Sequence, residues 1–380
     1  MIDQKRFLKE LNEAGVEFIT GVPDTLLNEF CLEVSAALGK DKHVIAANEG
    51  NALALAAGYH LATGTVPLVY MQNSGIGNAL NPLISLTGKD VYSIPMILLI
   101  GWRGDPSLND HPQHVLQGKL TPILMDDLDI PYIIVENEGD LPFEAAKWAV
   151  QTANENQSPV ALIARKGVFE RGEKDDLSKL ESPFSLNREM AMECILNSLP
   201  QDSLYVATTG RATRELHEVR NLRGEGHEND FLNVGAMGHT SSIAAGIAIA
   251  NNKRVVVCLD GDGAAIMHMG ALVVNGDLEL GNFIHIILNN GVHESVGGQP
   301  TVGQKVDFTS LAEKSGYKTP GKALQTAEEI QEFLGGVDLG NGPYLLDVRI
   351  RKGMRQDMPP LKIDPLQIKK LFIEKNLKLL

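Results

Sequence analysis

The sequence predicts an α/β fold made of two doubly wound parallel-sheet domains. Three observations lead to this prediction: short apolar strands alternate with helical patterns over the first 165 residues, a charged stretch at 171–176 interrupts them, and a second alternating series begins at residue 187. Strands that alternate with helices indicate βαβ units and parallel sheets. A chain of 380 residues is long enough for two such domains of roughly 150–200 residues each.

The elements follow in chain order. An amphipathic N-terminal helix, MIDQKRFLKELNEAG, has no apolar stretch typical of a signal peptide. The strands expected in the first series are 17–20, 44–47, 66–71, 95–100, 132–135 and 160–164. A helix over 187–198 opens the second series, whose expected strands are 204–207, 231–234, 255–259, 283–288 and 344–348. The predicted divisions are a first domain over 1–165, a linker over 166–186, a second domain over 187–360 and a C-terminal helical tail over 361–380.

Composition limits the possible partners. The net charge of −14 argues against nucleic acid and against an anionic membrane surface. It also means that an anionic substrate has to be met by a local cluster of positive groups. The three cysteines, Cys31, Cys194 and Cys258, have no metal spacing, so neither a disulfide frame nor a zinc site is expected. No apolar run approaches the roughly 20 residues of a membrane span, and the expectation is a cytoplasmic globular protein.

A Gly-Asp-Gly turn and an Asn-Asn pair end two consecutive strands of the second domain. The strand over 255–259 runs into Asp260 and Gly261-Asp262-Gly263, and the next apolar strand ends in Asn289-Asn290. Open α/β sheets bind ligands at the carboxyl ends of their strands. A carboxylate, an amide oxygen and a nearby backbone carbonyl suit Mg²⁺, and glycines let the backbone approach a diphosphate.

Three other interpretations of this turn compete with a magnesium-diphosphate site. A calcium loop starting at Asp260 would need a carboxylate at its twelfth position, where Ala271 stands, and is rejected. A dinucleotide fingerprint would need a third glycine at the position of Ile266. A polar turn without any ligand is the third interpretation, and the Asn-Asn pair at the end of the next strand counts against it.

Three further turns each allow a structural or a functional interpretation. Glu49 follows the strand over 44–47 and opens a small-residue helix, so it is either a first-turn residue favoured by the helix dipole or a functional carboxylate. The turn VGAMGHT, which contains Gly235 and Met237, is either an ordinary glycine-rich helix entry or a ligand contact. Thr208-Thr209-Gly210 is either common helix capping or a diphosphate contact.

Taken together, these motifs resemble those of the thiamine-diphosphate (ThDP) enzymes, in the order pyrimidine domain and then diphosphate domain. The resemblance implies that Glu49 holds N1′ of the aminopyrimidine and that Met237 wedges beneath the cofactor. It implies Mg²⁺ ligation by Asp262, Asn290 and the Val292 carbonyl, with Asn289 supporting the turn. The implied cofactor contacts are Glu49, Thr208, Thr209, Gly235, Met237, Gly261, Gly263 and Ala264.

The two-domain length, without a central domain, resembles the phosphonopyruvate decarboxylase family, with sulfopyruvate decarboxylase as a close relative. Local sequences that support it are TGVPD at 20–24, MQNSGIGN at 71–78, HPQH at 111–114, TGR at 209–211 and NNGVHESVGGQP at 289–300. His111 departs from the acidic residue expected before Pro-Gln-His. The family resemblance implies non-oxidative decarboxylation of 3-phosphonopyruvate to phosphonoacetaldehyde, through an ylide and an enamine of the cofactor, in phosphonate biosynthesis.

Residue roles in substrate handling are also implied only by resemblance. His114 and His293 are expected to transfer protons beside the catalytic Glu49, and the expected substrate contacts are Asp24, Gln113, His114, His293 and Ser295, with Arg211 more distant. In this family the cofactor lies between subunits, so a homo-oligomer, a dimer at minimum, is implied. Sulfopyruvate decarboxylase and a nicotinamide-dependent α/β oxidoreductase are the alternatives.

Overall fold

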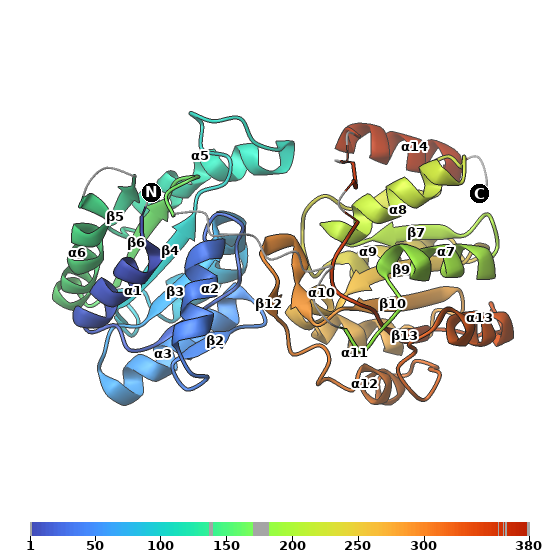
Figure 1. The fold of residues 1–380 in the computed structure, drawn as a ribbon, viewed down its shortest axis with the longest axis horizontal. Coiled ribbons are helices and arrows are strands. Elements are labelled where there is room, and N and C mark those ends of the chain that lie inside the picture. The colour runs from blue at the N-terminus through green and yellow to red at the C-terminus, as the bar shows by residue number, and fades with distance from the viewer. Residues whose placement is uncertain are drawn as a thin grey trace. The chain divides into compact units, whose positions relative to one another are not determined.

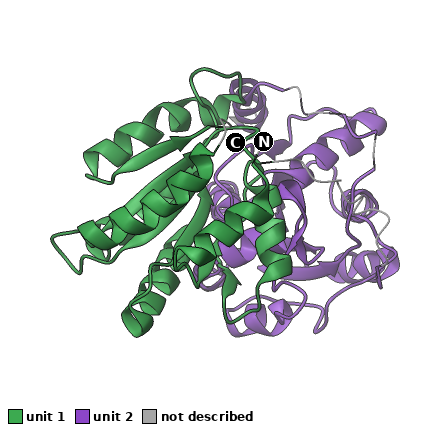
Figure 2. Cartoon of the chain, turned by 60° about the vertical axis from the view of Figure 1, so that its left-hand side comes forward, with its two compact units in different colours: residues 1–174 green, residues 175–380 purple. Residues whose placement is uncertain are grey.

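Two compact units make up the chain. The computed structural model describes residues 2–136, 140–169, 182–355, 357–359, 361 and 363–377. The units are Met1–Lys174 and Asp175–Leu380 (Figures 1 and 2). Each contains its own parallel sheet, which confirms the predicted α/β fold of two parallel-sheet domains. The charged stretch 171–176 of the predicted linker lies outside the described residues, so the linker bounds remain a prediction.

The first unit is built on a six-stranded parallel sheet in the order β2-β1-β3-β4-β6-β5. Its strands are β1 (Ile19–Gly21), β2 (His43–Ile45), β3 (Leu68–Gln72), β4 (Met96–Gly101), β5 (Tyr132–Val135) and β6 (Pro159–Ala164). The chain passes from β1 to β2 in one direction and from β3 to β4 in the other. The carboxyl ends of β1 and β3 therefore flank a topological switch point, where open α/β sheets bind ligands.

Helices cover both faces of this sheet (Figure 1). They are α1 (Gln4–Glu13), α2 (Asn28–Ala37), α3 (Glu49–Thr63), η1 (Asn73–Gly75), α4 (Ile76–Ser85), α5 (Pro112–Asp127) and α6 (Leu141–Asn156). Alternate residues of β4 serve different faces: Ile97 and Leu99 join the core with α1, α2 and α6, whereas Met96, Leu98 and Ile100 join the core with α3, α4 and α5. Burial on both faces explains why β4 is a continuous apolar run.

The second unit contains a five-stranded parallel sheet in the order β13-β10-β9-β7-β8. Its strands are β7 (Leu204–Ala207), β8 (Asp230–Leu232), β9 (Val256–Gly261), β10 (Phe283–Asn289) and β13 (Tyr344–Arg349). A small antiparallel ribbon follows β10 and consists of β11 (Val292–His293) and β12 (Gln299–Pro300). The switch point of this sheet lies between β7 and β9, because the chain leaves these two strands in opposite directions.

The helices of the second unit again sort to two faces (Figure 1). They are α7 (Arg188–Ser198), α8 (Arg211–Leu222), α9 (Thr240–Ala250), α10 (Asp262–Met267), α11 (Gly270–Asp277), η3 (Glu294–Val296), α12 (Phe308–Lys314), α13 (Ala327–Gly336) and α14 (Pro365–Leu377). One core joins α7, α8 and α13 to the sheet, and the other joins α9, α11 and α12. Asn187 caps α7 by accepting a hydrogen bond from the Met190 N–H at 2.8 Å.

Candidate functional site

Asp262 and Asn290 lie at the carboxyl ends of two neighbouring strands. β9 and β10 pair in register through Gly261 and Leu288, so the residues that follow them share one edge of the sheet. Burial raises the pKa of the Asp262 carboxyl to about 6, against hydrogen bonds from Thr301 and from the Asn290 backbone. A cation beside this carboxylate would favour its ionised form.

The Asn290 side chain is held at both ends. Its Oδ1 accepts a hydrogen bond from the Val292 N–H at 3.1 Å, and its Nδ2 donates to Glu294 Oε2 at 2.7 Å. Asn289 instead faces the sheet and the following loop, since its Nδ2 donates to the Gly303 carbonyl at 3.0 Å and to Asp347 Oδ1 at 3.1 Å. Only Asn290 of the pair therefore lies with its amide beside the Val292 turn.

Close backbone approach explains two glycines around this carboxylate. A side chain at Gly303 would run into the carboxyl group of Asp262. A Cβ at Gly263 would lie 3.0 Å from the ring of His293, so His293 packs directly against the Gly-Asp-Gly turn. Burial lowers the pKa of His293 to about 4, which keeps its imidazole neutral near pH 7. The sequence-predicted residues Gly263, Asp262 and His293 are thus brought together.

The end of β7 adds two more predicted residues to this edge. Thr208 donates its N–H to the Leu259 carbonyl at 2.9 Å, and its buried hydroxyl has no hydrogen-bond partner among the described residues. Thr209 follows it, and Gly210 has a φ of +100°. A Cβ at Gly210 would lie 2.5 Å from Ser295 Oγ, so Ser295 lies against this turn. Gly261 and the buried Ala264 flank Asp262 at the end of β9.

The Met237 turn is tight because residues on both sides of Met237 have left-handed backbone conformations. Ala236 has a φ of +47° and Gly238 a φ of +83°. Gly235 donates its N–H to Asn233 Oδ1 at 3.2 Å, and the Met237 carbonyl oxygen lies 3.1 Å from His239 Nδ1. Met237 itself is half-buried.

In the first unit, Glu49 is buried at the start of α3. Asn48 caps the helix by accepting from the Asn51 N–H at 2.9 Å, which places Glu49 in the first turn. Asn78 Nδ2 donates to Glu49 Oε2 at 2.7 Å. A Cβ at Gly75 would lie 2.5 Å from Glu49 Cδ, so the loop after β3 can approach the carboxyl group only because residue 75 is glycine. Asn78 is the one side chain among the described residues that donates to this carboxyl group, so the carboxyl group can accept a further donor.

Asp24, after β1, belongs to a second polar group of the first unit. Burial raises the pKa of Asp24 to about 6, opposed by backbone hydrogen bonds and by Arg103. Arg103 pairs with Asp110 through Nε at 2.7 Å and Nη2 at 2.6 Å and also reaches Thr25 Oγ1 at 3.2 Å. His114 lies on the first turns of α5, where burial and then Arg103 lower its pKa.

The predicted residue Gln113 lies one position before His114 and is half-buried. Two charged residues of this group, Arg103 and Asp110, were not predicted from the sequence. Arg103 was missed, although it lies two positions after the strand end at Gly101, and an acidic chain implies local cations. Position 111, where the resemblance leads one to expect an acidic residue, is His111. The acidic residue Asp110 lies one position earlier and accepts a hydrogen bond from the His111 N–H at 2.8 Å.

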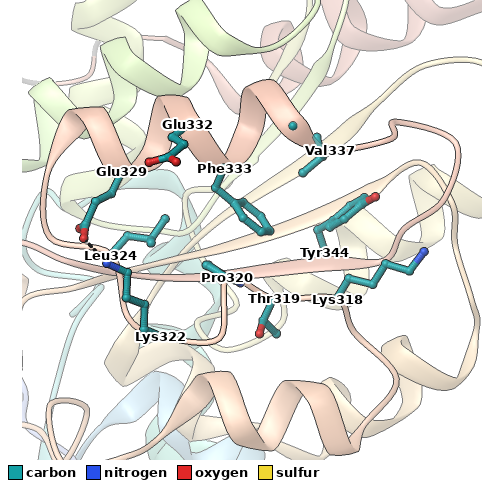
Figure 3. Close-up of a pocket in the computed structure, with 11 residues that line it drawn as sticks. Lys318, Thr319, Pro320, Lys322, Leu324, Glu329, Glu332, Phe333, Val337 and Tyr344 are labelled. Atoms are coloured by element: carbon teal, nitrogen blue, oxygen red, sulfur yellow. Dashed lines mark hydrogen bonds and ion pairs between the residues drawn. The ribbon is translucent and has the colours of Figure 1, made fainter.

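A surface groove of about 600 Å³ lies elsewhere in the second unit (Figure 3). It runs between α13 and the segment 318–324 beside β13, and its walls include Phe333 and Tyr344. None of the sequence-predicted site residues lines it. Within the described residues, every helix is too short or too polar to cross a membrane.

Comparison with known proteins agrees with the two-part architecture. Residues 4–128 match the thiamine pyrophosphate (that is, ThDP) enzyme N-terminal TPP-binding domain, and residues 208–348 match the corresponding C-terminal TPP-binding domain. These matches lie in the first and second units respectively. They confirm the predicted order of domains and decide against the nicotinamide oxidoreductase.

Three curated relatives span most of the chain. A phosphonopyruvate decarboxylase of Streptomyces hygroscopicus is 31% identical, covering 98% of this chain and 94% of its own length. One of Streptomyces viridochromogenes is 29% identical over the same shares. A sulfopyruvate decarboxylase of Methanosarcina acetivorans is 27% identical over 87% of each chain. The chain belongs to the phosphonopyruvate decarboxylase family of thiamine pyrophosphate enzymes.

Proposed function

We propose that the chain is a ThDP- and Mg²⁺-dependent decarboxylase that converts 3-phosphonopyruvate to phosphonoacetaldehyde and CO₂. The observation that carries this proposal is the 31% identity, over nearly the whole of both chains, to a phosphonopyruvate decarboxylase. The two TPP-binding domain matches support the cofactor independently of the substrate.

The donor set in the second unit fits Mg²⁺. Asp262 supplies a carboxylate, Asn290 an amide oxygen and Val292 a backbone carbonyl, and Mg²⁺ completes its octahedron with phosphate oxygens. Asp262 is buried and forms no ion pair among the described residues, so a cation here would stabilise its negative charge. The unpartnered hydroxyl of Thr208, with Thr209, Gly261, Gly263 and Ala264, would contact the diphosphate.

Bound ThDP would supply the carbon nucleophile and the electron sink for loss of CO₂. Glu49 would hold the proton shared with N1′, and Asn78 fixes the direction of that carboxyl group. Gly235 and Met237 would contact the aminopyrimidine through their backbones, with the Met237 side chain beneath it. Neutral His114 and His293 would then accept or return protons at the substrate carbon.

The anionic substrate requires cations, because the chain carries a net charge of −14. Arg103 in the first unit and Arg211 in the second lie near the proposed substrate residues of their own units. Asp24, Gln113 and Ser295 would add polar contacts. Arg103 forms an ion pair with Asp110, whereas Arg211 forms no ion pair within the described part of the chain. The positive charge of Arg211 is therefore the more available of the two for a substrate.

Assembly and location complete the proposal. A homo-oligomer, a dimer at minimum, would join the pyrimidine domain of one subunit to the diphosphate domain of another. The three cysteines are free and buried, which suits a cytoplasmic protein. The domain limits proposed are 1–165 and 187–360, with the linker and tail as predicted.

The test is CO₂ release by purified protein with ThDP and Mg²⁺, offered phosphonopyruvate, sulfopyruvate and pyruvate in parallel. Turnover of phosphonopyruvate above the others is expected. Preference for sulfopyruvate would favour the second candidate, which the Methanosarcina acetivorans relative supports. No release from any of the three, with cofactor bound, would refute the decarboxylase.

A further inference from the structure

A buried ionic network adjoins the proposed metal ligand Asn290. Arg188, at the start of α7, donates from Nη1 to Glu215 Oε1 and from Nη2 to Glu294 Oε2, both at 2.6 Å. Glu294 Oε2 also accepts from Asn290 Nδ2 at 2.7 Å. Arg188 and Glu294 are each 6% exposed, and Glu215 is 2% exposed. The residues come from α7, α8 and η3, so the network joins three separate segments at one point.

The orientation of an asparagine amide has to be specified, because its oxygen and nitrogen are nearly equal in size. Only the oxygen can bind Mg²⁺ or accept a hydrogen bond. Two neighbours of Asn290 select the same orientation: the Val292 N–H can only donate, and it meets Oδ1 at 3.1 Å, while an ionised Glu294 can only accept, and it meets Nδ2. Arg188 holds the same oxygen of Glu294 in place with a charge-assisted hydrogen bond at 2.6 Å.

We propose that Glu294, anchored by Arg188, is a positioning residue that turns the Asn290 amide oxygen toward the cation site beside Asp262. This inference rests on the proposed function, since it needs the Mg²⁺ assigned there. To that function it adds a supporting residue that is not itself one of the proposed metal ligands. Supporting partners of this kind commonly change metal affinity by 10–100-fold when they are removed.

A second buried ion pair in the same unit provides a contrast. Arg220 pairs with Asp230 through Nε at 3.0 Å and Nη2 at 2.9 Å, and both residues are buried. Asp230 begins β8, whereas the proposed ligands lie at the carboxyl ends of β9 and β10. Removing the carboxylate of Glu294 or of Asp230 leaves a buried arginine with one carboxylate partner fewer, which destabilises the fold. Only loss of Glu294 should disturb Asn290.

The test uses titration calorimetry of Mg²⁺ into full-length protein with saturating ThDP, with thermal melting of each variant. Glu294→Gln is expected to weaken Mg²⁺ binding by about 10-fold or more, because glutamine cannot replace the carboxylate that holds both Arg188 and Asn290. Asp230→Asn is expected to lower the melting temperature and leave Mg²⁺ affinity at the wild-type value. Equal affinities for Glu294→Gln and wild type would overturn the inference, as would an equal loss in Asp230→Asn.

Three more variants keep the test decisive if Glu294→Gln does not fold. Glu294→Asp keeps the charge for Arg188 but shortens the reach to Asn290, and it is expected to fold and still bind Mg²⁺ more weakly. Asn290→Asp should weaken Mg²⁺ binding, because it sets a carboxylate at position 290 against the carboxylate of Glu294. Adding Glu294→Gln to Asn290→Asp should restore binding, because the glutamine amide can donate where the glutamate accepted. Absence of this rescue would contradict the orienting role. Wild-type protein that binds neither ThDP nor Mg²⁺ would instead refute the proposed function, and this inference with it.

Discussion

Burial of His43 should make the stability of the first unit depend on pH. His43 begins β2, is 9% exposed and lies with Nε2 2.9 Å from the hydroxyl oxygen of buried Tyr70. Burial lowers the pKa of His43 from 6.5 to about 4. Between these two values the unfolded chain binds more protons than the folded one, so the stability is fully present above pH 6.5 and is lost as the pH falls toward 4. The loss is roughly 3.4 kcal/mol in full and about 2 kcal/mol between pH 7.5 and pH 5.

The variant His43→Gln removes the titrating group and keeps an acceptor for Tyr70. The two tryptophans of the chain, Trp102 and Trp148, both lie in the first unit, so urea unfolding followed by tryptophan fluorescence reports on that unit. The free energy of unfolding of His43→Gln should fall about 2 kcal/mol less than that of wild type between pH 7.5 and pH 5. Tyr70→Phe is the control: it removes the hydroxyl but leaves His43 buried, so it should keep the wild-type dependence. An unchanged pH dependence in His43→Gln would refute the reasoning.

The remaining predictions concern the proposed site. Glu49→Gln should abolish turnover with little change in melting temperature, and full activity in this variant would exclude the proton-holding role. Gly75→Ala should reduce turnover, because the new methyl group displaces the Glu49 carboxyl group. A steady-state assay checks the turnover and circular dichroism checks that the variant is folded, and a wild-type kcat would contradict the close approach. Asp262→Ala should lower the affinity for Mg²⁺ and ThDP by at least 10-fold in calorimetry, and an unaltered affinity would remove Asp262 from the metal site.

Strands could be predicted from the sequence where apolar residues run continuously, and their ends could not. Each of the eleven expected strands overlaps a strand of the two sheets, and those over 132–135 and 204–207 have the expected bounds. The strand expected to end at residue 259 continues to Gly261 as β9. Asp260 can lie inside a buried strand because its carboxylate accepts from the Gly261 N–H at 3.0 Å and lies 3.3 Å from His285 Nε2. A partner 25 positions away along the chain thus overrides the usual preference of aspartate for turns.

The same limit applies to the candidate site. Short motifs such as Gly-Asp-Gly and Asn-Asn can be found in the sequence, because each lies at the carboxyl end of an apolar strand, which fixes its position in the sheet. The support behind them depends on residues far apart in the chain: Arg188 and Glu294 are separated by 106 positions. Arginine and glutamate are common surface residues, so neither position differs from its surroundings in the sequence. Only the packing of α7 against α8 and η3 turns them into a buried pair.

The ion pairs of the second unit also bear on its substrate. Arg188 and Arg220 each contact two carboxylates, so their charges are balanced within the fold. Arg211, at the first position of α8, instead donates to the Met354 sulfur and to the Glu294 carbonyl, and it forms no ion pair among the residues described. Burial lowers the pKa of Arg211, which means that its charge is costly to keep where it stands. Arg211 thus lies beside the Glu294 backbone and the predicted Ser295 with a charge that is not paired with a carboxylate among the described residues. An acidic protein needs such a cation if it is to hold an anionic substrate, and a phosphonate or sulfonate would offset the cost of burying the charge.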